Sequence, residues 1–162
     1  MTTINLSQKE RMLLEDQKSH EEICIKKYNN YAEQAQDPEL KQLFSEYAGQ
    51  ERQHYDTINQ ILSGRLPSMQ QGQQEQNQQY QQSKQKNMQA NADAGMINQA
   101  DAALCTDLLM TEKYVSNTYD TTIFECRDTN LRDVLNHIQK EEQQHGEGIF
   151  KYMESRGMYK VN

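Results

Sequence analysis

Long apolar runs are missing from this sequence. No stretch approaches the roughly 18–20 apolar residues that a membrane-spanning helix needs. The opening residues, MTTINLSQKERMLLED, lack the apolar core of a secretory signal. We therefore expect a protein that is made in the cytoplasm without a signal peptide and has no membrane partner.

Cysteine and proline are also scarce. Cys24, Cys105 and Cys126 are far apart and odd in number. Such spacing excludes a disulfide framework, a CxxC redox pair and a zinc ribbon, and it fits a reducing compartment. Pro38 and Pro67 are the two prolines, and neither interrupts the interior of a predicted helix.

Positive charge is in deficit, with 17 lysines and arginines against 24 aspartates and glutamates and a net charge of −7. This balance argues against nucleic acid and against an anionic membrane surface as the main partner. The length of 162 residues predicts one domain, 1–162, with enough chain to bury a core.

Two periodic blocks flank a biased segment. Apolar residues at a three–four spacing predict helical hairpins over residues 8–63 and 101–156, with Asp37 and Asp128 as helix N-caps. Between them, residues 65–100 predict a flexible or partly ordered linker, because 11 of the 20 residues from Gln70 to Gln89 are glutamine.

The two hairpins repeat one another at an offset of 91 positions. The matched pairs are Glu21 with Glu112, Tyr28 with Tyr119, Asp37 with Asp128, Leu40 with Leu131, Lys41 with Arg132, Glu51 with Glu142, and His54 with His145. Two repeated helical hairpins joined by a long segment predict an all-α four-helix bundle with one Gln-rich crossover.

Each hairpin carries a Glu-x-x-His motif, at Glu51–His54 and at Glu142–His145. Residues three apart share one face of a helix, so each motif can grip one ion. Glu21 lies sixteen residues before Asp37, and Glu51 lies fourteen after it. At about 1.5 Å per residue, antiparallel helices bring the two carboxylates to nearly the same height.

The predicted ligands lie on stripes that otherwise hold Leu, Ile and Tyr. Burying four carboxylates at one level is costly unless cations balance them. Oxygen-rich coordination with one imidazole per metal suits two Fe or Mn ions better than structural zinc, and this donor set is typical of di-metal carboxylate bundles. The predicted metal ligands are Glu21, Glu51, His54, Glu112, Glu142 and His145.

Other residues near the stripes receive plainer interpretations. The six-residue set could instead form a buried Glu–His network without metal. Glu22 and Glu141 are interpreted as solvated neighbours of the stripe, and His20 and His137 as flank or surface histidines. Tyr28 and Tyr119, two turns beyond Glu21 and Glu112, could face the site as hydrogen-bond donors, although tyrosines at such positions are more often core residues.

The two hairpins resemble the ferritin-like superfamily, including rubrerythrin and bacterioferritin. The second is similar to the Coat F family of spore coat proteins. That likeness is carried by Leu-Leu-x-x-Glu-Lys at Leu108–Lys113, by Tyr119, by Leu131-Arg132 and by the closing Tyr152–Tyr159 segment. The resemblance implies a ferritin-like bundle located in the spore coat, with other coat proteins as partners and a homo-oligomer as an open alternative.

Two functions follow from these patterns. The first is a spore coat-associated protein on a ferritin-like bundle with a di-metal carboxylate site. The second is a di-iron or di-manganese oxidoreductase that acts on peroxide or oxygen. The complete ligand set favours the second, whereas the coat resemblance and the lack of the CxxC pair that rubrerythrins carry favour the first.

Overall fold

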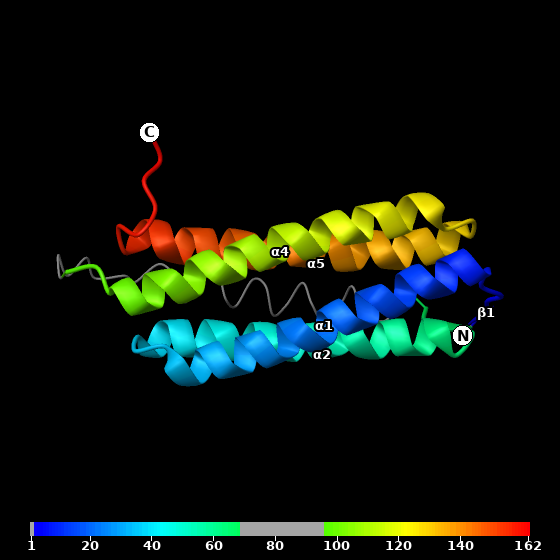
Figure 1. Ribbon diagram of the computed structural model, residues 1–162, viewed down its shortest axis with the longest axis horizontal. Helices are drawn as coiled ribbons and strands as arrows, with labels where there is room; N and C mark the ends of the chain where they lie inside the picture. Colours follow the sequence, from blue (N-terminus) through cyan, green and yellow to red (C-terminus); the bar gives the residue numbers. More distant parts are fainter. Residues whose placement is uncertain (1, 69–95) are drawn as a thin grey trace.

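The described residues form four long helices that lie side by side (Figure 1). The computed structural model describes residues 2–68 and 96–162, so most of the predicted Gln-rich linker lies outside the described residues. The helices are α1 (Gln8–Gln34), α2 (Pro38–Leu62), α4 (Gln99–Glu125) and α5 (Thr129–Ser155). The predicted all-α four-helix bundle is confirmed. Within the two described stretches, each helix falls short of the apolar length that crossing a bilayer requires.

Each helix begins at a polar N-cap. Ser7 starts α1 in a capping box with Glu10, and Asn98 starts α4 by accepting a hydrogen bond from the Asp101 N–H. The predicted caps Asp37 and Asp128 accept hydrogen bonds from the first turns of α2 and α5. These side chains satisfy N–H groups that a helix start leaves without partners.

Two short strands close one end of the bundle. β1 (Thr2–Thr3) pairs antiparallel with β2 (Arg65–Leu66), which lies where the sequence places the start of the linker. Gly64 makes the turn before β2 with a φ of 84°, a left-handed conformation that glycine adopts without strain. The N-terminus is thereby fixed beside the end of α2.

The helices form two antiparallel hairpins. α1 packs on α2 and α4 on α5, while α1 also contacts α4 and α2 contacts α5. In Figure 1, α2 ends at the end of the bundle that holds β1, whereas α4 begins at the opposite end. The last residue of α2 and the first residue of α4 therefore lie at opposite ends of the bundle, as the predicted crossover requires.

The apolar core is divided into two clusters by a polar layer. One cluster contains Leu14, Ile58, Val115 and Leu135, and the other contains Tyr28, Phe44, Leu108 and Ile149. On α2, α4 and α5 the predicted metal ligands fall between the residues of the two clusters, and on α1 Glu21 falls between Leu14 of the first cluster and Tyr28 of the second. The fold thus places the candidate site near the middle of the bundle, with apolar packing on both sides.

Buried acids in the first turns of α1 and α4 tie the hairpins together. Glu10 accepts a hydrogen bond of 2.8 Å from the backbone N–H of Arg127, in the α4–α5 turn. Asp101 stands 91 positions after Glu10 and accepts from the N–H groups of Gln36 and Asp37, in the α1–α2 turn, at 2.9 and 3.0 Å. Each hairpin therefore caps the turn of the other.

We expect Asp101→Ala to lower the free energy of unfolding by about 1–3 kcal/mol, because two backbone N–H groups lose their acceptor. Urea unfolding followed by circular dichroism measures this loss. Asp120→Ala is the matched control, since Asp120 is exposed on the same helix. Equal losses in the two variants would show that the Asp101 contacts stabilise nothing.

Candidate metal centre

The structure brings all six predicted ligands into one buried layer. α1 supplies Glu21, α4 supplies Glu112, and α2 and α5 each supply a Glu and a His from one motif. None is more than 3% exposed: Glu21, Glu51, His54, Glu112, Glu142 and His145. The layer forms two overlapping groups whose ligand atoms lie within 4.8 Å of one another.

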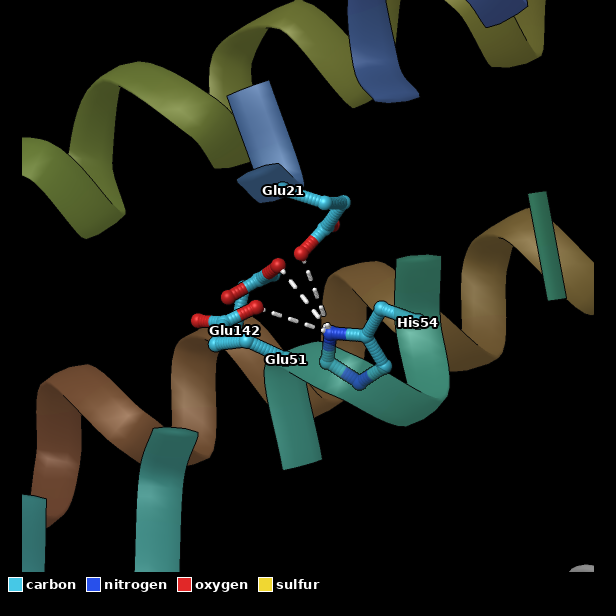
Figure 2. A group of neighbouring side chains, drawn as sticks. All are labelled: Glu21, Glu51, His54 and Glu142. Atoms are coloured by element: carbon cyan, nitrogen blue, oxygen red, sulfur yellow. Dashed lines mark hydrogen bonds and ion pairs between the residues drawn. The ribbon is translucent and has the colours of Figure 1, made fainter. Parts of the chain in front are cut away.

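The first group surrounds His54. Its Nδ1 lies 3.1 Å from Glu51 Oε2, 3.3 Å from Glu142 Oε1 and 3.7 Å from Glu21 Oε2. Figure 2 shows the three carboxylates converging on this one ring nitrogen. One imidazole and three carboxylates from three different helices thus face a common point.

The second group surrounds His145. Its Nδ1 lies 3.2 Å from Glu51 Oε1, 3.3 Å from Glu112 Oε1 and 3.4 Å from Glu142 Oε2. Glu51 and Glu142 therefore belong to both groups, and each turns one carboxylate oxygen toward each histidine. Carboxylates in this position can bridge two cations.

The outer ring nitrogens are held by the opposite hairpin. His54 Nε2 lies 2.7 Å from Glu141 Oε2, and His145 Nε2 lies 2.5 Å from Gln50 Oε1. Both oxygens are acceptors, so Nε2 carries a proton. A metal that displaces the second proton of the ring would therefore meet the lone pair of Nδ1, which faces the layer. A ring with its proton on Nε2 alone is the tautomer which binds a metal through Nδ1.

The interpretation of Glu141 as a solvated neighbour was wrong. Its side chain is buried because α5 packs against α2 at this level, which turns the carboxylate toward His54. Burial raises the pKa of Glu141, but hydrogen bonds with His137 and His54 outweigh it and lower the pKa to about 2. Glu141 is therefore an anion at neutral pH.

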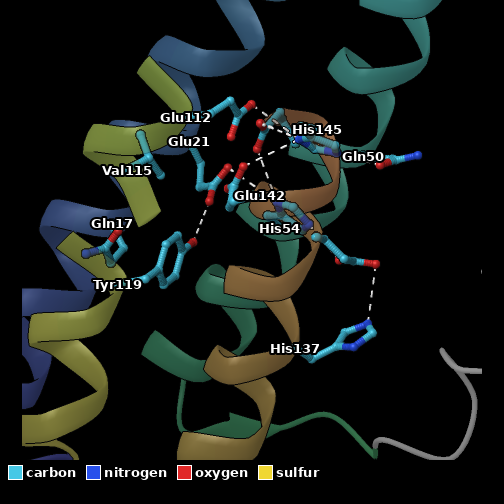
Figure 3. Close-up of polar contacts among 12 residues, drawn as sticks. Gln17, Glu21, Gln50, His54, Glu112, Val115, Tyr119, His137, Glu142 and His145 are labelled. Atoms are coloured by element: carbon cyan, nitrogen blue, oxygen red, sulfur yellow. Dashed lines mark hydrogen bonds and ion pairs between the residues drawn. The ribbon is translucent and has the colours of Figure 1, made fainter. Parts of the chain in front are cut away.

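Two tyrosines cross between the hairpins to the same layer. The Tyr28 hydroxyl donates to Glu112. The Tyr119 hydroxyl donates to Glu21 (Figure 3). Each tyrosine serves the glutamate of the other hairpin, so the predicted donors do face the site. Tyr119 holds Glu21 Oε1 and leaves Oε2 facing His54. Tyr28 holds Glu112 Oε1, the oxygen that also faces His145.

Buried carboxylate oxygens remain without hydrogen bonds. Among the described residues they are Glu21 Oε2, Glu112 Oε2 and both oxygens of Glu142. A buried, unpaired carboxylate oxygen is costly unless a cation balances it. These three carboxylates, the shared carboxylate of Glu51 and two imidazoles with inward Nδ1 atoms match the donors that Fe and Mn prefer, so the residues fit a pair of such ions.

Burial and mutual repulsion raise the pKa values of three carboxyls in the layer, those of Glu51, Glu112 and Glu142. Burial, followed by the charges of Glu21 and Glu112, raises the pKa of Glu51 to about 7. Burial and the charge of Glu142 raise the pKa of Glu112 to about 8. The pKa of Glu142 is raised for the same reasons. Without bound cations, the layer therefore does not keep all four carboxyls ionised at neutral pH.

Burial and the nearby carboxylates act in opposite directions on the pKa values of the two histidines. Burial lowers the pKa of His54, but hydrogen bonds to Glu141 and other carboxylates outweigh it and raise the pKa well above 6.5. Burial also lowers the pKa of His145, but carboxylate contacts, chiefly the charge of Glu112, outweigh it and raise the pKa well above 6.5. Burial raises the pKa of Glu21, but its contacts with His54 outweigh burial and lower the pKa to about 2.

The remaining neighbours lie nearer the surface. Glu22 is exposed, as predicted, and His20 and His137 are half-buried. Sequence reasoning missed Gln50, which holds His145, and gave no role to Tyr47, whose ring stacks on His145 at 4.3 Å. The repeat contained a signal for Gln50, because it and Glu141 occupy matching positions just before the two motifs.

One comparison with known proteins matches the second hairpin. The family model of the Coat F domain matches residues 100–162, which contain α4 and α5. This match supports the predicted resemblance to the Coat F family. The comparisons with curated proteins and with solved structures gave no match. The matched segment carries Glu112, Glu142 and His145, which are half of the six candidate ligands.

We expect the chelator-treated protein to lose stability as the pH rises from about 5 to about 8. Glu51 and Glu112 stay protonated in the folded protein at pH values where the unfolded chain has lost those protons, because their pKa values are raised to about 7 and 8. The raised histidine pKa values act in the same direction. Urea unfolding at several pH values should show a fall of a few kcal/mol.

Replacing Glu112 by Gln removes one of these titrations and should make the pH dependence shallower. Glu22→Gln changes an exposed carboxyl on α1 and should leave the slope unchanged. A flat profile, or stability that increases with pH over this range, would contradict the assignment of repulsion within the layer.

Proposed function

We propose that this chain is a spore coat-associated protein on a ferritin-like four-helix bundle and that it binds two Fe or Mn ions. The observation that carries the metal site is the set of buried carboxylate oxygens without hydrogen bonds, which face two inward Nδ1 atoms. A structural Glu–His network would pair these oxygens, whereas cations supply the missing partners.

The residues divide naturally between two ions. Glu21 and His54 would hold one ion and Glu112 and His145 the other, while Glu51 and Glu142 would bridge them. Four carboxylates balance the charge of two divalent cations. Tyr28 and Tyr119 would fix the orientation of the terminal carboxylates through their hydroxyl donors.

The coat assignment is supported by the Coat F match over residues 100–162. In the coat, the bundle would contact other coat proteins, and a second copy of the chain is a further candidate partner. A metal-binding role and a coat role are compatible, since the candidate site is buried and leaves the helix surfaces available for assembly.

An oxidoreductase is the second candidate function. The observation that favours it is the number of ligands: each group offers one imidazole and three carboxylates, fewer than the six positions that Fe and Mn commonly fill. Bound Fe or Mn would supply the electrons to reduce peroxide or oxygen. This chain's own residues would position the ions and exclude bulk water by their burial.

Protein produced with added Fe or Mn is expected to hold about two ions per chain. Glu51→Ala should reduce the content to about one ion or fewer, because Glu51 faces both histidines. Elemental analysis gives the content, and anomalous scattering at the Fe and Mn edges locates the ions. Glu22→Ala is the control and should retain two ions. Native protein with well under one ion, unchanged by Glu51→Ala, would refute the metal site.

Coat association has its own test. An antibody against this chain should detect it in purified spores and in coat extracts. Its detection in the cytosol of vegetative cells, together with its absence from purified spores, would refute the coat assignment and leave the metal site unaffected.

A further inference from the structure

The repeat relates the two histidines, but the groups that hold them differ in charge. Gln50 and Glu141 occupy the same repeat position, each just before a glutamate of the metal layer. Each holds the histidine of the opposite hairpin: Glu141 accepts from His54 Nε2 at 2.7 Å, and Gln50 from His145 Nε2 at 2.5 Å. One histidine is thus bonded to a buried carboxylate and the other to a neutral amide.

The charge difference acts directly on the ligand atoms. A carboxylate that accepts the Nε2–H makes the imidazole a stronger donor at Nδ1 and adds a negative charge behind it. An amide oxygen fixes the ring without adding charge. Glu141 is also oriented from its second oxygen, which lies 3.3 Å from His137 Nε2.

Two further differences separate the halves of the layer. The ring of Tyr47 stacks on His145, with the two planes inclined by 27°. The repeat position that matches Tyr47 is Ile138, so within the described residues no tyrosine stacks on His54 as Tyr47 stacks on His145. At another pair of matching repeat positions, α1 has the thiol of Cys24 where α4 has the aliphatic side chain of Val115. The surroundings of the two positions are therefore chemically distinct.

We infer that the two metal positions are inequivalent, that the first divalent cation binds at His54, and that Glu141 is the positioning residue that sets this order. The inference rests on the proposed di-metal site and deepens it. Gln50 is the matching residue at the weaker position, and the two hairpins thus define a first and a second binding step.

Titration calorimetry with Mn²⁺ alone on the metal-free full chain at pH 7.5 tests the order. Two steps are expected, with dissociation constants that differ about 10–100-fold, the usual effect of a residue that holds a ligand histidine. Crystals given one equivalent of Mn²⁺ should show the stronger anomalous peak beside His54.

Variants at the matching positions assign the cause. Glu141→Gln should weaken the first step about 10–100-fold, so that the two steps merge. Gln50→Glu should strengthen the second step, so that the two dissociation constants again become similar. If circular dichroism shows that Glu141→Gln does not fold, Gln50→Glu alone tests whether the charge at this position sets the affinity. Glu154→Gln removes an exposed carboxylate from the same helix and should leave both steps unchanged.

The outcomes separate this inference from the proposed function. Uptake of well under one Mn²⁺ per chain would remove the di-metal site itself. Uptake of two Mn²⁺ with a single dissociation constant that neither variant changes, or equal anomalous peaks at one equivalent, would overturn the inequivalence and leave the di-metal site intact.

Discussion

The electrostatic cost of burying four carboxylates in one layer governs this molecule. Glu21, Glu51, Glu112 and Glu142 are each at most 2% exposed. Glu51 is paired with both histidines, whereas one or both oxygens of the other three carboxylates have no hydrogen-bond partner among the described residues. Such a layer persists in a folded protein only if its desolvation and repulsion are offset, and the imidazoles and tyrosine hydroxyls supply part of that compensation. The two apolar clusters on either side supply the packing that holds the layer in place.

Contacts that support the layer run mainly from one hairpin to the other. Tyr28 donates to Glu112 and Tyr119 to Glu21, while Glu141 holds His54 from the opposite motif. At the ends of the bundle, Glu10 and Asp101 likewise accept hydrogen bonds from the turn of the other hairpin. Neither hairpin therefore contains a complete site, and the folding of one depends on groups that the other supplies.

This exchange bears on how the Coat F match is understood. The match covers residues 100–162 and so contains one of the two hairpins. The hydrogen-bond partners of Glu112 and His145 are Tyr28, Gln50 and Glu51, which lie in residues 8–62, outside the match. The six residues of the layer are buried inside the bundle, so they do not form part of the outer helix surfaces of the matched hairpin.

The sequence by itself determined the helices, the 91-residue repeat and the six residues of the layer, because helical period and N-caps are local properties. Only the tertiary structure decided which side chains meet across the hairpins. Glu141 shows the reason: its position along α5 suggested solvent, yet the packing of α2 against α5 buries it on His54. Contacts between helices depend on their relative rotation and spacing, which local sequence patterns do not specify.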